Sequence, residues 1–203
     1  MKLSRWLSVI SVFAILSAQS VQAQTEEVET ENPYKRKPST FAIGAEIGMN
    51  SLSSLVGINA SLLTVPRWAF DAGLGLGMNG LRTGFRGRYF FSDAKFAPFA
   101  GLALKQSSGT GGYSDVKVTK DKEETIYRIK SDPATFTDFS VGIDYKAHTG
   151  FNLIVSLGYS YSFTGKNWKA DSIGPIPTDD AKTLFDFIYG SGLLLGVNLG
   201  WAF

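Results

Sequence analysis

The sequence predicts an all-β protein: an eight-stranded antiparallel up-and-down transmembrane β-barrel. Three observations predict it. Bulky apolar residues alternate with small ones in eight segments, glycine concentrates on the small-residue side, and the connections divide into short and long ones. The 203-residue chain has no cysteine, which excludes disulfides and thiolate metal sites. Its stability must therefore come from packing and backbone pairing.

The N-terminus has the three parts of a secretory signal peptide. Lys2 and Arg5 form a short basic region, residues 6–16 an apolar run, and Val21-Gln22-Ala23 a small-residue cleavage site. The alternative, a membrane anchor, needs roughly 20 apolar residues, about twice the length of this run. We therefore expect export and cleavage after residue 23.

A flexible N-terminal linker is expected over residues 24–38, because this segment is acidic, then basic, and contains two prolines. The barrel domain is predicted over residues 39–203. Removal of residues 1–23 takes away Lys2 and Arg5, which leaves 18 basic residues against 18 acidic ones. A neutral exported chain has no electrostatic footprint for nucleic acid, so no nucleic-acid partner is expected.

Strands are predicted wherever apolar residues recur with a period of two between turn residues. In one segment Trp68, Phe70, Leu74 and Leu76 share a face opposite Asp71 and a run of glycines. The predicted strands cover 39–50, 54–63, 68–79, 81–91, 96–106, 135–147, 151–164 and 185–203.

The small-residue face distinguishes a membrane barrel from a soluble one. That face is mostly Gly, Ser, Ala and Asn, and it carries 14 of the 22 glycines. Such a face is too small for an ordinary solvent-exposed surface, whereas small residues relieve crowding inside a narrow barrel. The bulky face is then expected to point outward into lipid.

Connection lengths support the same architecture. The connections near 64–67, 92–95 and 148–150 are short, and those near 107–134 and 165–184 are long. Short periplasmic turns and longer outer loops are typical of bacterial outer-membrane barrels. An even number of strands that closes on itself also leaves no backbone group unpaired in hydrocarbon.

The alternating strands, the long loops and the final Gly200-Trp-Ala-Phe203 resemble the small outer-membrane barrels of the OmpA and OmpX type, often called porin-family proteins. The resemblance covers about residues 39–203. It implies a Gram-negative outer-membrane location, with outer-membrane lipid around the barrel. It also implies that the barrel-assembly machinery reads the last strand as a signal, at Leu195, Val197, Leu199, Trp201 and Phe203.

No catalytic, cofactor-binding or metal site is predicted, and the chain is not expected to be an enzyme. Residues 75–80 match G-x-G-x-x-G, but Asn79-Gly80 predicts a hairpin there, whereas a dinucleotide site needs a following helix. Residues 92–95 match S-x-x-K without the partner motifs. His148, the single histidine, falls in a periplasmic turn, out of hydrogen-bond reach of any serine at the outer rim.

Charged residues on the small-residue face predict a network inside the barrel. Charges in a narrow lumen are costly unless paired, and four acids and five bases occur there. Two interpretations stay open: a salt-bridged plug that stabilises the lumen, and the lining of a narrow channel. The predicted network consists of Glu46, Asp71, Arg82, Arg86, Arg88, Lys105, Asp138, Asp144 and Lys146.

The charged loop 107–134 is a candidate for contacts with a surface partner. Its flanks have strand character and would extend the predicted strands 96–106 and 135–147 as a protruding hairpin, whose edge can recruit a partner by strand addition. A solvated run of charge is the more common explanation of such a segment. The sequence thus favours a structural, envelope-integrity or surface-interaction role over a passive channel or transporter for small solutes or apolar ligands. An outer-leaflet lipid-modifying enzyme is the remaining alternative.

Overall fold

The computed structural model describes residues 40–65, 67–120, 123–172 and 175–203. The predicted signal peptide, residues 1–23, and the predicted linker, residues 24–38, lie outside the described residues.

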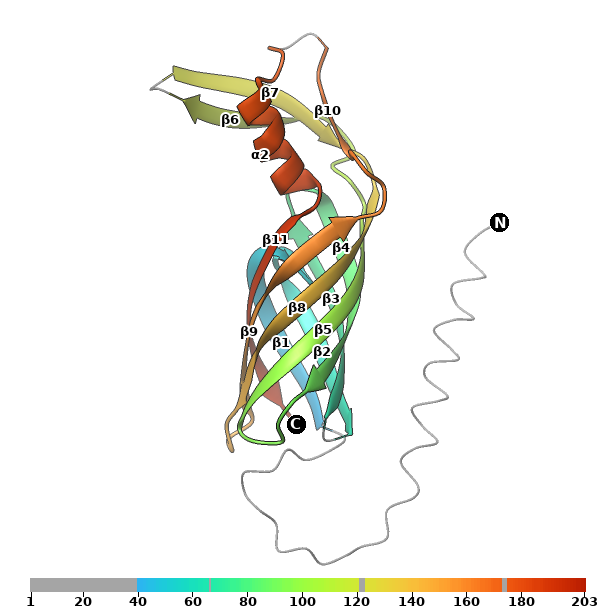
Figure 1. Ribbon diagram of the computed structural model, residues 1–203, viewed down its shortest axis with the longest axis vertical. Helices are drawn as coiled ribbons and strands as arrows, with labels where there is room; N and C mark the ends of the chain where they lie inside the picture. The colour runs from blue at the N-terminus through green and yellow to red at the C-terminus, as the bar shows by residue number, and fades with distance from the viewer. Residues whose placement is uncertain (1–39, 66, 121–122, 173–174) are drawn as a thin grey trace, which may run out of the picture. The chain divides into compact units, whose positions relative to one another are not determined.

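Eight antiparallel strands close into one barrel (Figure 1). Each strand pairs with the next barrel strand along the chain, which confirms the predicted all-β, up-and-down architecture. The barrel strands are β1 (Thr40–Ser51), β2 (Ser54–Val65), β3 (Trp68–Gly77), β4 (Gly80–Phe90), β5 (Phe96–Ser107), β8 (Ala134–Lys146), β9 (Phe151–Ser162) and β11 (Gly192–Ala202).

The barrel closes where β1 pairs with β11, in a register that runs from Ala42 opposite Ala202 to Met49 opposite Leu195. Closure removes both sheet edges, so no row of backbone donors and acceptors in the barrel is left unpaired. We call the end with the β2–β3, β4–β5 and β8–β9 connections the inner end, and the opposite end the outer end.

The side chains of the barrel are distributed opposite to those of a soluble protein. On β3 the outward-facing Trp68, Phe70, Leu74 and Leu76 are 44–59% exposed, whereas the inward-facing Asp71 is 2% exposed. The same alternation runs along the other barrel strands, which confirms the predicted assignment of the two faces. The outer surface of the barrel is apolar and its interior is polar.

A small apolar core fills the inner end of the lumen. The rings of Phe90 and Phe99 meet edge to face, with their centroids 6.1 Å apart. This arrangement suits the quadrupoles of the two rings. The buried cluster consists of Leu63, Ala69, Phe90, Ala97, Phe99 and Ile154.

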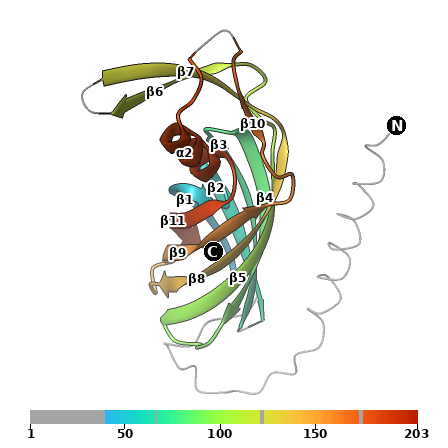
Figure 2. The same ribbon diagram turned by 45° about the horizontal axis from the view of Figure 1, so that its top comes forward.

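Four further elements lie beyond the outer end of the barrel (Figures 1 and 2). The strands β6 (Ser114–Lys120), β7 (Glu123–Ser131) and β10 (Trp168–Ala170) form a sheet in the order β10-β7-β6. The helix α2 (Asp179–Tyr189) packs on this sheet. We call these four elements the outer module. Its β6–β7 hairpin confirms the strand character expected for the flanks of loop 107–134, but the two strands belong to a separate sheet with β10 and do not extend β5 and β8.

The outer module has an apolar core of its own. The ring of Phe185 on α2 makes edge contacts with Tyr127 of β7 and Trp168 of β10, at centroid distances of 5.6 and 5.2 Å. The Trp168 indole N–H also donates to Asp186 at 2.6 Å. These contacts bury the apolar face of α2 against the sheet.

The prediction of a strand over residues 185–203 was wrong for the first seven residues, 185–191. Residues 185–189 belong to α2, and only residues 192–202 form β11. The Thr178 side chain caps the helix by accepting from the Ala181 N–H, and two aspartates in the first turn suit the positive end of the helix dipole. Among the described residues, no helix is both long and apolar enough to cross a membrane.

Candidate functional site: the barrel interior

The barrel interior collects the charged residues that the sequence predicted. Eight of the nine are at most 4% exposed and point into the lumen: Glu46, Asp71, Arg82, Arg86, Arg88, Lys105, Asp138 and Asp144. Lys146 lies at the inner rim and is partly exposed. Because an unpaired charge at such depth is costly, the pairing of these groups determines what the lumen can do.

The inner part of the lumen is built around Asp71 of β3. The Nε atoms of Arg86 and Arg88, both on β4, lie 2.7 Å from its Oδ2 atom. Arg88 Nη2 donates to the other carboxylate oxygen at 2.7 Å, as does the Ser61 hydroxyl at 2.6 Å. Asp71 and Arg86 stand opposite each other in the β3–β4 register, and Arg88 is two residues further along the same face. The strand register therefore brings these three charges together.

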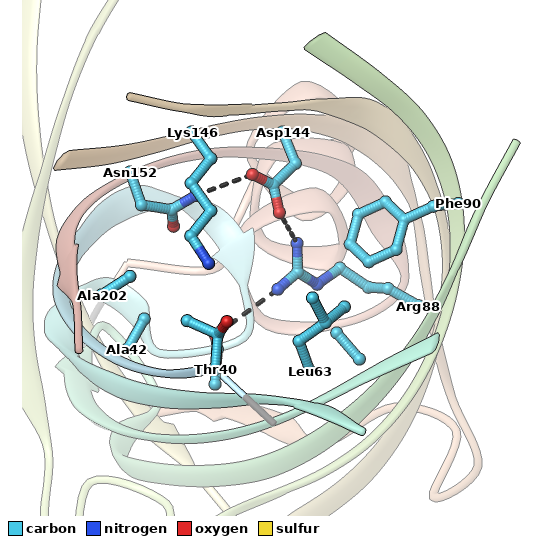
Figure 3. Close-up of a pocket in the computed structure, with 11 residues that line it drawn as sticks. Thr40, Ala42, Leu63, Arg88, Phe90, Asp144, Lys146, Asn152 and Ala202 are labelled. Carbon is cyan, nitrogen blue, oxygen red and sulfur yellow. Dashed lines mark hydrogen bonds and ion pairs between the residues drawn. The ribbon is translucent and has the colours of Figure 1, made fainter. Parts of the chain in front are cut away.

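Arg88 carries this network across the lumen to β8. Its Nη1 atom lies 2.7 Å from Asp144 Oδ2, and the Asn152 side chain donates to the other oxygen of Asp144 at 2.7 Å (Figure 3). The guanidinium carbon is 5.3 Å from the ring centroids of Phe90 and Phe99. Two aspartates thus balance two arginines in what we call the inner cluster: Asp71, Arg86, Arg88 and Asp144.

A small recess opens at the inner end beside this cluster (Figure 3). Its volume is about 30 Å³, and its lining includes Arg88, Asp144, Lys146 and Asn152. A space of this size holds about two water molecules. It is too small for a solute.

A second group of charges lies toward the outer end, and Lys105 of β5 is at its centre. Lys105 Nζ lies 2.7 Å from Asp138 Oδ2 and donates to the backbone carbonyls of Asn50 and Ser51 at 2.6 and 3.3 Å. All three ammonium donors therefore have acceptors. Arg82 lies over the ring of Phe136, with its guanidinium carbon 4.8 Å from the ring centroid, and Lys105 contacts the same ring. We call Glu46, Arg82, Lys105 and Asp138 the outer cluster.

The outer cluster holds the β1–β2 connection inside the barrel. Glu46 accepts from the backbone N–H of Ser53 at 3.1 Å, while Lys105 binds the carbonyls just before this point. Leu52 is 1% exposed and Ser53 is fully buried. The connection Ser51–Ser54, which we call the plug turn, therefore folds into the lumen.

The glycines of the neighbouring strands make room for the plug turn. A Cβ atom at Gly73 would lie 2.8 Å from Ser53 Oγ and 2.9 Å from Leu52 Cγ, and one at Gly84 would lie 2.9 Å from Leu52 Cδ1. Such distances are too short for real carbon atoms. Glycine is required at these positions because the turn occupies the space of their side chains. Seven glycines border the plug turn in this way: Gly48, Gly57, Gly73, Gly75, Gly77, Gly84 and Gly196.

Several buried arginine nitrogens in the lumen have no hydrogen-bond partner among the described residues. They are Nε and Nη1 of Arg82 in the outer cluster and Nη2 of Arg86 in the inner cluster. Buried polar groups are normally satisfied by protein or by ordered water. Ordered water is the remaining partner available to these atoms.

The structure thus places eight of the nine predicted residues in two clusters without net formal charge, with Lys146 outside both. The outer cluster contacts an element that the sequence did not predict, the plug turn. The predicted strands 39–50 and 54–63 leave a connection of only three residues, Ser51-Leu52-Ser53, and strand alternation gave no sign that it folds into the lumen, where Leu52 and Ser53 are buried. The signal was present in the glycines: Gly48, Gly57, Gly73, Gly75 and Gly84 all face the same part of the interior.

The other predicted positions take the places expected from the fold. Leu195, Val197, Leu199, Trp201 and Phe203 all face outward and are 37–77% exposed. Their recognition by the assembly machinery stays a prediction. Gly77 and Gly80 pair across the β3–β4 hairpin, so residues 75–80 turn into a strand, as expected. His148 lies in the β8–β9 connection at the inner end.

An exposed ion pair joins β10 of the outer module to Asp132, the residue after β7. The Lys169 ammonium lies 2.7 Å from Asp132 and, by hydrogen bonding to that carboxylate, lowers the pKa of Asp132.

In the part of the chain that the structure describes, no three His, Cys, Asp or Glu side chains are grouped so as to hold a metal ion.

No protein-family model matches the chain, and no curated protein sequence matches it. The structure is similar to the crystal structure of the N-terminal β-barrel domain of OprF from Pseudomonas aeruginosa. The TM-score is 0.49, with 13% sequence identity over 83% of this chain and 100% of that domain. The closed barrel of eight strands fits the small OmpA-like architecture that the sequence resembles.

We predict that Gly73→Ala destabilises the barrel by about 1–3 kcal/mol, because the added methyl group overpacks the plug turn. Gly87→Ala is the matched control, since its Cβ would face outward with the Phe70 ring at 3.7 Å, an ordinary contact. Urea unfolding in lipid vesicles, followed by tryptophan fluorescence, measures both changes. Equal stability of the two variants would contradict the position of the plug turn.

We also predict that Asp71→Asn lowers the free energy of unfolding by about 3–5 kcal/mol, because it leaves two buried arginines without their shared carboxylate. The matched control is Asp93→Asn, which breaks the exposed 3.1 Å pair with Arg67. This pair is screened by solvent, so no resolved change is expected. The same urea titration compares them, and a neutral Asp71→Asn would mean that the inner cluster does not stabilise the barrel.

Proposed function

We propose that the protein is an integral outer-membrane β-barrel with a structural role in the bacterial envelope, and that its outer module makes surface contacts. The observation that carries this proposal is the inverted distribution of side chains, with an apolar outer surface around a polar interior. In water, such a surface would leave most of the bulky apolar side chains of the barrel unburied. In a bilayer, the same side chains face hydrocarbon.

The dimensions of the barrel support insertion into a membrane. Its strands contain 10 to 13 residues, and about 9 to 11 tilted residues span the hydrocarbon core. Outward aromatic pairs occur at both ends, with Trp68 near Tyr89 at the inner end and Tyr161 near Phe163 at the outer end. Amphipathic rings favour the headgroup level of a bilayer.

The contents of the lumen support a structural role over transport. The inner cluster bridges the lumen from β4 to β8, and the plug turn fills it further out. Each cluster contains two acids and two bases, so neither carries a net formal charge that would attract ions. A solute would have to break ion pairs between side chains that are almost completely buried.

A narrow channel is the second candidate. It is favoured by the unpartnered guanidinium nitrogens of Arg82 and Arg86, because water that satisfies them could form part of a conducting path. Displacement of the plug turn would then expose the glycine-lined space around it.

A catalytic role is not proposed. A lipid-modifying enzyme of the outer leaflet needs a general base near the outer rim, and His148 lies at the inner end.

The route to the outer membrane that we propose begins with export through a signal peptide over residues 1–23. The barrel-assembly machinery then recognises the outward side chains of β11. The surrounding lipid would contact the apolar belt of all eight strands.

Conductance in planar bilayers tests the structural proposal. The refolded wild-type protein should show no current steps. Joint replacement Glu46→Gln and Lys105→Met removes both charges that hold the plug turn, and this variant should conduct. Heat-dependent gel mobility confirms that each sample is folded. Steady wild-type conductance whose ion selectivity changes with Arg86→Glu would overturn the structural role in favour of the channel.

A further inference from the structure

Among the residues that the structure describes, the strand β6 has a free edge at the boundary of the outer module. In the sheet order β10-β7-β6, it pairs with β7 on one side, and no described strand pairs with its other side. Strand edges with unpaired backbone groups bind other strands unless charge or geometry prevents it. The inference drawn from this edge deepens the surface-interaction role proposed above and rests on it.

The side chains of β6 alternate between two faces. Val116 and Val118 pack, partly buried, against the apolar core of the outer module. Asp115 and Lys117 point to the other face, and their side chains are 70% and 56% exposed. Each has one partner on β7: Asp115 lies 3.6 Å from Arg128, and Lys117 lies 2.6 Å from Glu124. Both charges therefore remain accessible to a second partner.

The order Asp115-Val116-Lys117 is self-complementary about Val116. If two copies of β6 pair antiparallel with Val116 opposite Val116 of the second copy, each Asp115 stands opposite a Lys117 of the other chain. Opposite charges in directly opposed positions stabilise a sheet, and like charges destabilise it. A shift by two residues places Lys117 opposite Lys117 or Asp115 opposite Asp115, so this register is favoured over its neighbours.

We infer that β6 is a homodimer interface, at which a second copy of this chain adds its own β6 in the register centred on Val116. The contact is isologous, as expected for a two-fold dimer. The two-fold axis runs perpendicular to the sheet, so the packed faces of both modules lie on the same side of a continuous sheet ordered β10-β7-β6-β6-β7-β10. The half-covered sides of Val116 in the two copies then shield each other from water.

Disulfide trapping tests this interface, because the chain has no cysteine and each introduced thiol is unique. The full chain with Val116→Cys, reconstituted in lipid vesicles and oxidised, should give a covalent dimer. Val118→Cys is the matched control on the same face. In the proposed register its two copies are four residues apart, about 13 Å along the strand, so it should not form a disulfide.

Charge exchange provides the decisive comparison. Asp115→Lys in the Val116→Cys background should lower trapping about tenfold, because two attractive pairs become repulsive. Adding Lys117→Asp restores opposite charges in the same register and should restore trapping. The inference would be overturned if Val116→Cys and Val118→Cys formed the disulfide dimer equally well, or if neither formed it. It would also be overturned if the yield of dimer did not change when the charges at Asp115 and Lys117 are exchanged.

The outcome is separable from that of the proposed function. Heat-dependent mobility and the absence of conductance, measured on the same vesicles, report on the barrel and its closed lumen. A folded, non-conducting barrel without trapping contradicts the dimer alone. A protein that does not insert into the vesicles contradicts the proposed function itself.

Discussion

The pairing of buried charge is the constraint on which the rest of this structure depends. A closed ladder of eight strands satisfies the backbone, and its apolar outer face leaves the narrow interior to the polar residues. Four acids and four bases lie there, almost completely removed from solvent. The four charges of the inner cluster are tolerated because the register of β3, β4 and β8 places Asp71 and Asp144 against Arg86 and Arg88. The same pairing bridges the inner half of the lumen from β4 to β8.

In the outer half of the lumen, the buried charges are satisfied mainly by backbone groups. Lys105 and Glu46 have too few charged neighbours to complete their hydrogen bonds, and the backbone of the plug turn supplies the missing acceptors and donor. The turn can enter only because glycines leave space along β3 and β4. Glycine normally weakens a strand. Its frequency on the inward face of the barrel is therefore explained by the space that the contents of the lumen need, and not by strand formation.

The strands and the orientation of their faces could be predicted from the sequence because period-two alternation determines which side chains share a face. Alternation carries no information on the path of a short connection, so the plug turn was missed although Gly73 and Gly84 pointed to it. It also misled at the start of β11. Phe185, Phe187 and Tyr189 alternate as in a strand, but Thr178 and the following aspartates begin a helix, in which Ala181, Phe185 and Tyr189 share the buried face.

The central claim, that the bulky outer face lies in lipid, is tested most directly by spin labels at unique cysteines. Labels at Phe139, Val141 and Ile143, exposed positions on β8, should collide with dissolved oxygen and not with a water-soluble nickel complex in reconstituted vesicles. A label at Ile126, an equally exposed position on β7 of the outer module, should collide more with the nickel complex and less with oxygen. Nickel access at Val141 equal to that at Ile126 would contradict the membrane-embedded barrel.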